Sequence, residues 1–119
     1  LLTAARPMAG QGRLVALFQP HLFTRTRDFA GAFGAALALA DEVVVLDVYP
    51  AREDPIAGVT GELVADAARS AGARVTYVAD KRHAPGVLAR LLRPGDLALT
   101  IGAGDVTAVG PATMAQVMK

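Results

Sequence analysis

Four short apolar runs alternate along this chain with longer segments in which apolar residues recur every three or four positions. The runs cover residues 13–18, 43–48, 74–78 and 96–101, and the second, rich in valine, is the clearest of them. Runs of this length are typical of strands covered on both faces, whereas the spacing between the runs is typical of amphipathic helices. Strands that alternate with helices over short connections predict a parallel sheet with right-handed crossovers. We therefore expect an α/β fold with a mostly parallel sheet.

Helical spacing predicts helices at residues 24–40, 60–71, 85–92 and 110–118. In the first of them Phe29 and Phe33 belong to one apolar stripe, and we expect both rings in the core. Helices packed on a parallel sheet give a Rossmann-like three-layer domain. The other residues that we expect to face the sheet are Ala36, Leu37 and Ala40 in the first helix, Leu63, Val64, Ala67, Ala68 and Ala71 in the second, and Leu88, Leu91 and Leu92 in the third.

The size and charge of the chain limit what it can be. At 119 residues it is long enough for one hydrophobic core, so residues 1–119 are expected to form a single domain, with residues 1–12 as the tail of a preceding helix and a loop. The formal net charge is +1 with both signs spread along the chain, which argues against a nucleic acid or membrane partner. With no cysteine and no long apolar stretch, we expect a cytoplasmic protein.

The residues from Phe18 to Phe29 are the ones that a purely structural role explains least well. This segment follows the first predicted strand and opens the first predicted helix, so it lies at the carboxyl edge of the sheet, where α/β folds bind their ligands. Its donors suit an anion such as a carboxylate or a phosphate beside a helix N-terminus. These donors are His21, Thr24, Arg25, Thr26 and Arg27.

Two interpretations of this segment stay open. In the structural one, Thr24 or Thr26 caps the helix while Arg25 and Arg27 lie in solvent. In the functional one, the arginines bind an anionic ligand. The helix dipole favours anions rather than cations in the first turn, so two arginines there need a compensating negative charge, and a bound anion would supply it.

Two further turns are expected at the same edge of the sheet. The connection from Tyr49 to Val59 is longer than the fold requires and is a candidate functional loop, and Asp47 just before it could be a pocket residue or a satisfied acceptor. After the last predicted strand, glycines 102 and 104 would let backbone amides approach a ligand closely. Asp105 could then meet an ammonium group or cap the next turn.

Four segments in the same order resemble the C-terminal domain of the Mur ligase family of bacterial cell-wall synthesis. The first is Phe18-Gln19-Pro20-His21 followed by residues 24–27, and the others are residues 47–53, 55–59 and 102–106. The resemblance covers nearly the whole chain, from about Arg13 to the end. Leu22 departs from the pattern, because many relatives carry an arginine there, so part of their anion-binding equipment is absent or replaced.

The resemblance implies the C-terminal domain of a larger ligase that joins L-alanine to UDP-N-acetylmuramate at the expense of ATP. ATP and Mg²⁺ would then be held mainly by a central domain, and this domain would present the amino acid and close the site. Its partners would be the N-terminal and central domains of the same chain and the two substrates. The domain alone is expected to be inactive, because positioning all the reactants is what such a site contributes.

The resemblance also implies roles for individual residues in substrate binding, with no catalytic or metal-binding residue in this domain. His21 and Arg25 would bind the carboxylate of the amino acid or the lactyl group, and Tyr49 would enclose the small side chain. Gly104 would allow close approach, and Asp105 would meet the ammonium group.

Other classes fit less well. A chain without a glycine-rich loop ending in Lys-Ser or Lys-Thr cannot be a complete ATPase of that type, and the glycines at 102 and 104 come too late for a dinucleotide fingerprint. His21 and His83 lack a carboxylate at metal-ligand spacing. A free-standing Rossmann-like or flavodoxin-like ligand-binding module remains the alternative, although a signalling module of this kind should show an acidic cluster after its first strand.

Overall fold

The computed structural model describes residues 12–50 and 52–102, and the predicted helix at 110–118 and nearly all of the predicted N-terminal tail lie outside this part. Four strands and four helical segments alternate within it, which confirms the order expected from the sequence. The strands are β1 (Leu14–Gln19), β2 (Glu42–Leu46), β3 (Val75–Val78) and β4 (Leu97–Gly102). The helices are α2 (Phe23–Leu37), α3 (Glu62–Ser70), the short 3₁₀ helix η2 (Lys81–His83) and α4 (Ala84–Leu91).

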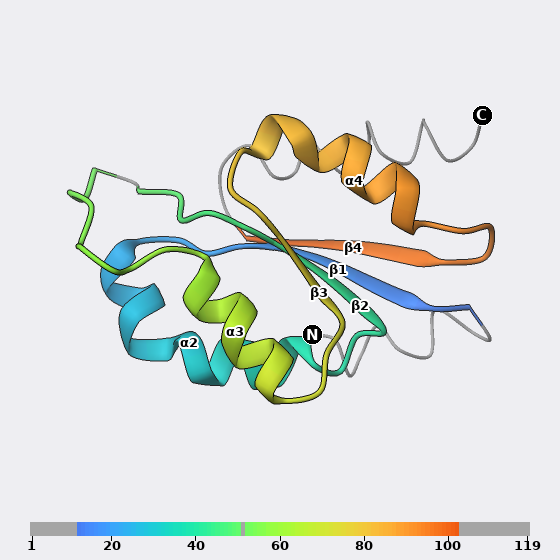
Figure 1. Ribbon diagram of the computed structural model, residues 1–119, viewed down its shortest axis with the longest axis horizontal. Helices are drawn as coiled ribbons and strands as arrows, with labels where there is room; N and C mark the ends of the chain where they lie inside the picture. The colour runs from blue at the N-terminus through green and yellow to red at the C-terminus, as the bar shows by residue number, and fades with distance from the viewer. Residues whose placement is uncertain (1–11, 51, 103–119) are drawn as a thin grey trace.

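The strands form one parallel sheet in the order β3-β2-β1-β4. Phe18 near the end of β1 pairs with Val45 on one side and Ile101 on the other, so the carboxyl ends of the strands meet at one edge. This edge lies at the left of Figure 1. The predicted α/β class and parallel sheet are therefore confirmed.

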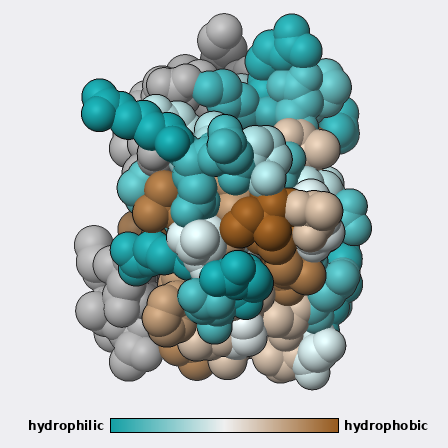
Figure 2. Space-filling model, turned by 90° about the vertical axis from the view of Figure 1, so that its left-hand side faces the viewer, coloured by the Kyte–Doolittle hydropathy of each residue, from teal (hydrophilic) through white to brown (hydrophobic). Residues whose placement is uncertain are grey.

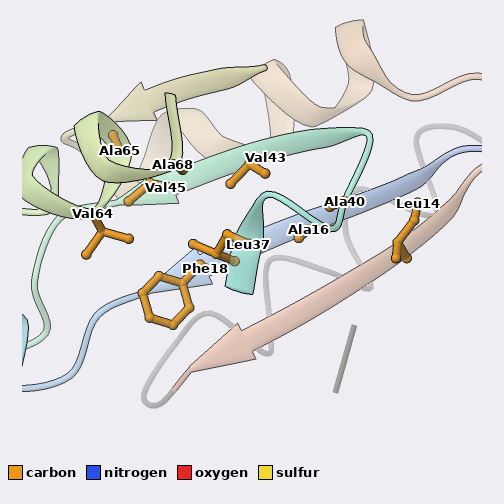
Figure 3. Packing of buried hydrophobic residues seen from close by; sticks show 10 residues of the cluster. All are labelled: Leu14, Ala16, Phe18, Leu37, Ala40, Val43, Val45, Val64, Ala65 and Ala68. Atoms are coloured by element: carbon orange, nitrogen blue, oxygen red, sulfur yellow. The ribbon is translucent and has the colours of Figure 1, made fainter. Parts of the chain in front are cut away.

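Helices cover both faces of the sheet, with α2 and α3 on one face and α4 on the other (Figure 1). The larger of the two main core clusters lies between the sheet and α2 and α3. Figure 3 shows its side chains, which come from β1, β2, the two helices and, for Ala40, the turn between α2 and β2. The second cluster lies under α4. All side chains of β1 and β2 are buried, which is why both strands are apolar apart from Gln19 at the end of β1 and Glu42 at the start of β2. No helix in the described part is long and apolar enough to cross a membrane.

A glycine allows α2 and α3 to pack closely. A Cβ added at Gly34 would lie 2.5 Å from the Cβ of Ala67 and 2.6 Å from backbone atoms of α3. Since real Cβ atoms do not approach so closely, any larger residue at this position would push the two helices apart. The contact fixes α2, and with it the turn that precedes α2, relative to the sheet.

The prediction that Phe29 lies in the core is wrong. Its side chain is 51% exposed, while Phe33 packs against the larger cluster and contacts Phe18 with ring centroids 5.4 Å apart. The buried face of α2 runs through Thr26, Ala30, Phe33, Gly34 and Leu37, so Phe29 lies at its margin, with its ring centroid 6.2 Å from that of Phe33. Ala36 in α2 and Ala71 after α3, both predicted to face the sheet, are also exposed, whereas Ala65 is buried.

Charged groups at the amino edge of the sheet pair with one another. Arg13 donates from Nη2 to the Asp96 carboxylate at 2.8 Å and to the Leu91 carbonyl at 2.6 Å, and its Nη1 lies 3.5 Å from Glu42. Asp41 accepts from the Leu14 amide at 2.7 Å. The Asp96 pKa is lowered, because hydrogen bonds from Arg13 and the Arg93 amide outweigh the effect of burial. This edge ties β1, α4 and the start of β4 together.

Candidate functional site

The structure brings His21 and Tyr49 together at the carboxyl edge of the sheet. They form an isolated parallel bridge just beyond the ends of β1 and β2, fixed by hydrogen bonds from the Tyr49 amide to the Pro20 carbonyl at 2.8 Å and from the Leu22 amide to the Tyr49 carbonyl at 2.9 Å. Their rings stack with centroids 5.8 Å apart and planes 29° apart. Two of the predicted site residues, 28 positions apart in sequence, are therefore neighbours, and both side chains are partly exposed.

The turn between β1 and α2 holds an unusual backbone conformation. Leu22 has φ 70° and ψ 137°, a region that residues with a Cβ rarely adopt. Its carbonyl accepts from both the amide of Thr26 at 3.1 Å and the hydroxyl of Thr26 at 2.7 Å. The fully buried Thr26 thus bonds back to the turn rather than to a ligand.

The N-terminus of α2 is capped by a carboxylate from the loop after β2. Glu53 accepts hydrogen bonds from the amide of Phe23, from the amide of Thr24 at 3.0 Å and from the hydroxyl of Thr24 at 2.7 Å. These bonds lower the Glu53 pKa, with the Thr24 hydroxyl the largest cause, and Arg27 adds to the shift. The anion that the helix dipole favours at this place is therefore supplied by the domain itself.

The two arginines of the first turns have different surroundings. Arg27 pairs with Asp28 at 2.9 Å, and both side chains are 53% exposed. Arg25 is exposed and makes no hydrogen bond or ion pair with the described residues. Glu53 and Asp28 account for the helix N-terminus and for Arg27, so of these two arginines Arg25 is the one left without a partner among the described residues.

A polar pocket of about 540 Å³ adjoins Tyr49 at the ends of β1, β2 and β3. Gln19, 5% exposed, lies in its wall. Its Oε1 has no hydrogen-bond partner among the described residues, while its Nε2 lies 3.5 Å from the Asp47 carbonyl oxygen. Figure 2 views this edge of the molecule and shows an apolar patch surrounded by hydrophilic residues. The lining residues are Gln19, Asp47, Val48, Tyr49, Pro50, Ala79, Asp80 and Lys81.

Asp47 takes both of the roles left open for it. It lines the pocket, and its Oδ1 accepts from the amides of Val48 at 2.8 Å and Gly61 at 3.0 Å. The Asp47 charge and hydrogen bond add to burial in raising the pKa of Tyr77 to about 12. Asp47 therefore ties the two ends of the long loop together as a structural acceptor.

The remaining predicted site residues, Gly104 and Asp105, lie outside the described residues. Within the described part, no group of three or more histidine, cysteine or acidic side chains could hold a metal ion. The described carboxyl edge of the sheet thus carries the stacked rings of His21 and Tyr49, the Arg25 guanidinium and the pocket that adjoins Tyr49. Such a set can bind and orient a small charged ligand.

Sequence comparison identifies the family. The model of the Mur ligase, glutamate ligase domain, matches residues 1–104. The chain belongs to the Mur ligase family. The resemblance seen in the four sequence segments is therefore confirmed.

Close relatives of this Mur ligase domain share one name, UDP-N-acetylmuramate–L-alanine ligase. The protein from Cutibacterium acnes is 66% identical over 108 residues, which are 91% of this chain and 23% of the relative. Those from Kineococcus radiotolerans and Saccharopolyspora erythraea are 65% and 59% identical over 93% and 99% of this chain, in each case 24% of the relative. The chain thus spans about a quarter of the length of the relatives it matches.

Sequence reasoning missed three residues at the edge of this Mur ligase domain. Glu53 was not predicted as the cap of α2, although a helix start with two arginines and no acidic residue is a signal that an anion must come from elsewhere. Gln19 could have been found as a polar residue at the end of a buried strand. Asp80 could have been predicted as a pocket residue, because it follows β3 and ligands of α/β sheets bind at the carboxyl ends of the strands.

Proposed function

We propose that this chain is the C-terminal domain of an ATP-dependent, ADP-forming cytoplasmic ligase that joins L-alanine to UDP-N-acetylmuramate. The names of its relatives support this activity, because three proteins that match more than nine-tenths of the chain share it. Their greater length supports further domains as partners of this one. The observation that carries a substrate-binding role is the pairing of His21 with Tyr49 just before the start of α2, whose first turn carries Arg25.

The proposed roles follow from the chemistry of these groups. Arg25 and His21 donate to the carboxylate of L-alanine or to the lactyl carboxylate of the second substrate, and the Tyr49 ring encloses the methyl group. Gly104 and Asp105 remain proposed residues for close approach and for the ammonium group. Leu22 offers no charge, so Arg25 is the cation available from the start of α2.

ATP and Mg²⁺ fit poorly to the described residues. The described residues contain no group of acidic side chains or histidines that could hold a metal ion, and the sequence contains no glycine-rich phosphate loop. In the proposed ligase these groups therefore need ligands outside the described part. The contribution of this domain is to bind and orient the amino acid so that its nitrogen is held against the activated carboxyl group.

The test uses the full-length protein that contains this chain. Formation of ADP should depend on both L-alanine and UDP-N-acetylmuramate. The fall in kcat/KM for L-alanine in His21→Ala should correspond to a loss of about 1.5–3 kcal/mol of transition-state stabilisation, the value of a hydrogen bond to a charged group. His83→Ala is the matched control, because His83 is exposed on η2. ADP formation that does not need L-alanine would refute the activity, and equal effects of the two variants would refute the role of His21.

A further inference from the structure

Glu53 connects the loop after β2 to the turn that carries His21. The backbone of Tyr49 bonds to Pro20 and Leu22, on either side of His21, and the carboxylate of Glu53 bonds to Phe23 and Thr24 immediately afterwards. The Glu53 amide in turn donates to the Pro50 carbonyl at 3.0 Å. The loop is thus attached to the turn at two successive points.

The attachment holds a strained conformation. Leu22, with φ 70°, and Arg52, with φ 71°, are the non-glycine residues of positive φ in the described part, and each is the immediate neighbour of an attachment point. Strained residues persist where surrounding contacts over-determine them. The three hydrogen bonds to Glu53 are such contacts, because they fix the chain directly after Leu22 and directly after Arg52.

The charge of Glu53 matters as well as its shape. A carboxylate accepts charge-assisted hydrogen bonds and interacts favourably with the positive end of the α2 dipole, whereas an amide of the same size does neither. Loss of this charge would let the turn relax toward an ordinary conformation at Leu22. Such a change moves the backbone on which His21 and Arg25 are carried.

We propose that Glu53 is a positioning residue for the amino-acid substrate, which holds the turn at Leu22 and thereby sets His21 against Tyr49 and places Arg25. Glu53 does not contact the substrate itself, because its carboxylate is engaged with Phe23 and Thr24. The inference rests on the proposed function for the identity of the substrate, while the positioning of His21 can be measured without it.

The first measurement is independent of activity. In the full-length protein with ¹³C-labelled histidine, the His21 signal, assigned by its loss in His21→Ala, should shift in Glu53→Gln and stay unchanged in Asp28→Asn. Asp28→Asn removes the same charge from an exposed pair one turn further along α2. An unchanged His21 signal in Glu53→Gln would overturn the positioning role.

The second measurement separates positioning from a merely structural role. Glu53→Gln should raise the KM for L-alanine by about tenfold, with the KM for ATP changed by less than about twofold, because only uniform binding of the amino acid is lost. Thr24→Val removes one donor to Glu53 and keeps the Glu53 charge. It should shift the His21 signal and the KM for L-alanine in the same direction as Glu53→Gln, but by less. If Glu53→Gln does not fold, Thr24→Val decides the question. A fall in kcat with all KM values unchanged would reduce Glu53 to a structural cap. Wild-type protein without L-alanine-dependent turnover would refute the proposed function, and the His21 signal would still decide the positioning.

Discussion

The two ends of the same strands are built differently. At the amino edge Arg13 pairs with both Glu42 and Asp96, and Asp41 accepts from a backbone amide. At the carboxyl edge neither the Gln19 side-chain oxygen nor the Arg25 guanidinium has a partner among the described residues, and two residues have positive φ.

This contrast separates stability from binding. Paired charges and ordinary backbone conformations lower the energy of the folded domain, whereas a buried acceptor without a partner and strained turns raise it and persist where they serve a ligand. Proteins commonly give up stability at functional sites in this way. Substitutions at the amino edge should therefore act on folding, and those at the carboxyl edge should act on the reaction.

The largest effect on activity is expected for Arg25. In the full-length ligase Arg25→Ala should cost on the order of 2–5 kcal/mol of transition-state stabilisation, because it removes one half of a charge pair that becomes desolvated when substrate binds. Steady-state kinetics with L-alanine and UDP-N-acetylmuramate measure this cost. The thermal midpoint should stay unchanged, since Arg25 makes no bond to the described residues.

Arg27→Ala is the control for that variant. Arg27 lies in the same helix, is about half exposed and binds Asp28 within the domain, so its loss should leave kcat/KM nearly unchanged. If both variants lose activity equally, the arginines act through the general field of the helix start. If Arg25→Ala keeps full activity with both substrates, Arg25 has no role in binding.

The opposite pattern is expected for Arg13 at the amino edge. Arg13→Ala leaves the Asp96 side chain, 5% exposed, without its cationic partner and also frees the Leu91 carbonyl. The loss should lower the free energy of unfolding by about 1–3 kcal/mol, the usual cost of leaving buried polar groups unsatisfied. Urea denaturation of the chain measures it, and KM values of the full-length protein should not change.

Arg74→Ala tests whether this cost arises from burial. The Arg74 guanidinium lies 3.8 Å from Glu42, but its side chain is 80% exposed, so its removal should change the free energy of unfolding by less than about 0.5 kcal/mol. A large loss from Arg74→Ala, or none from Arg13→Ala, would remove the distinction between the two edges.

The fold could be predicted because its signals are local. The two central strands are buried runs and the helices are periodic stripes, and both patterns can be read without knowing what lies opposite. Phe29 shows where this reasoning fails, because the centre of a stripe is set by how α2 lies on the sheet. The buried face of α2 is displaced by one residue from the face that the spacing predicts, and this displacement exposes the Phe29 ring.

The candidate site could be predicted only in part, for a related reason. His21 and Tyr49 follow from the rule that strand ends meet at one edge, since that rule needs only the order of the elements. Glu53 does not, because it meets Thr24 from 29 positions away through a loop whose path depends on the positive φ of Arg52. The charge that the helix start requires was predictable, and its source was not.

The smallest effect concerns the strain itself. Arg52 has φ 71°, which costs a residue with a Cβ roughly 1–2 kcal/mol, whereas glycine adopts it freely at an entropic cost of about 0.5–1 kcal/mol. Arg52→Gly should therefore raise the free energy of unfolding by up to about 1 kcal/mol. Arg69→Gly within α3 is the control, and it should lower the free energy of unfolding by about 1 kcal/mol because glycine has a low helix propensity. Urea denaturation of both variants under the same conditions measures the two shifts. If Arg52→Gly destabilises the chain as much as Arg69→Gly does, the backbone at residue 52 is unstrained, and the contrast between the two edges rests on unpaired groups alone.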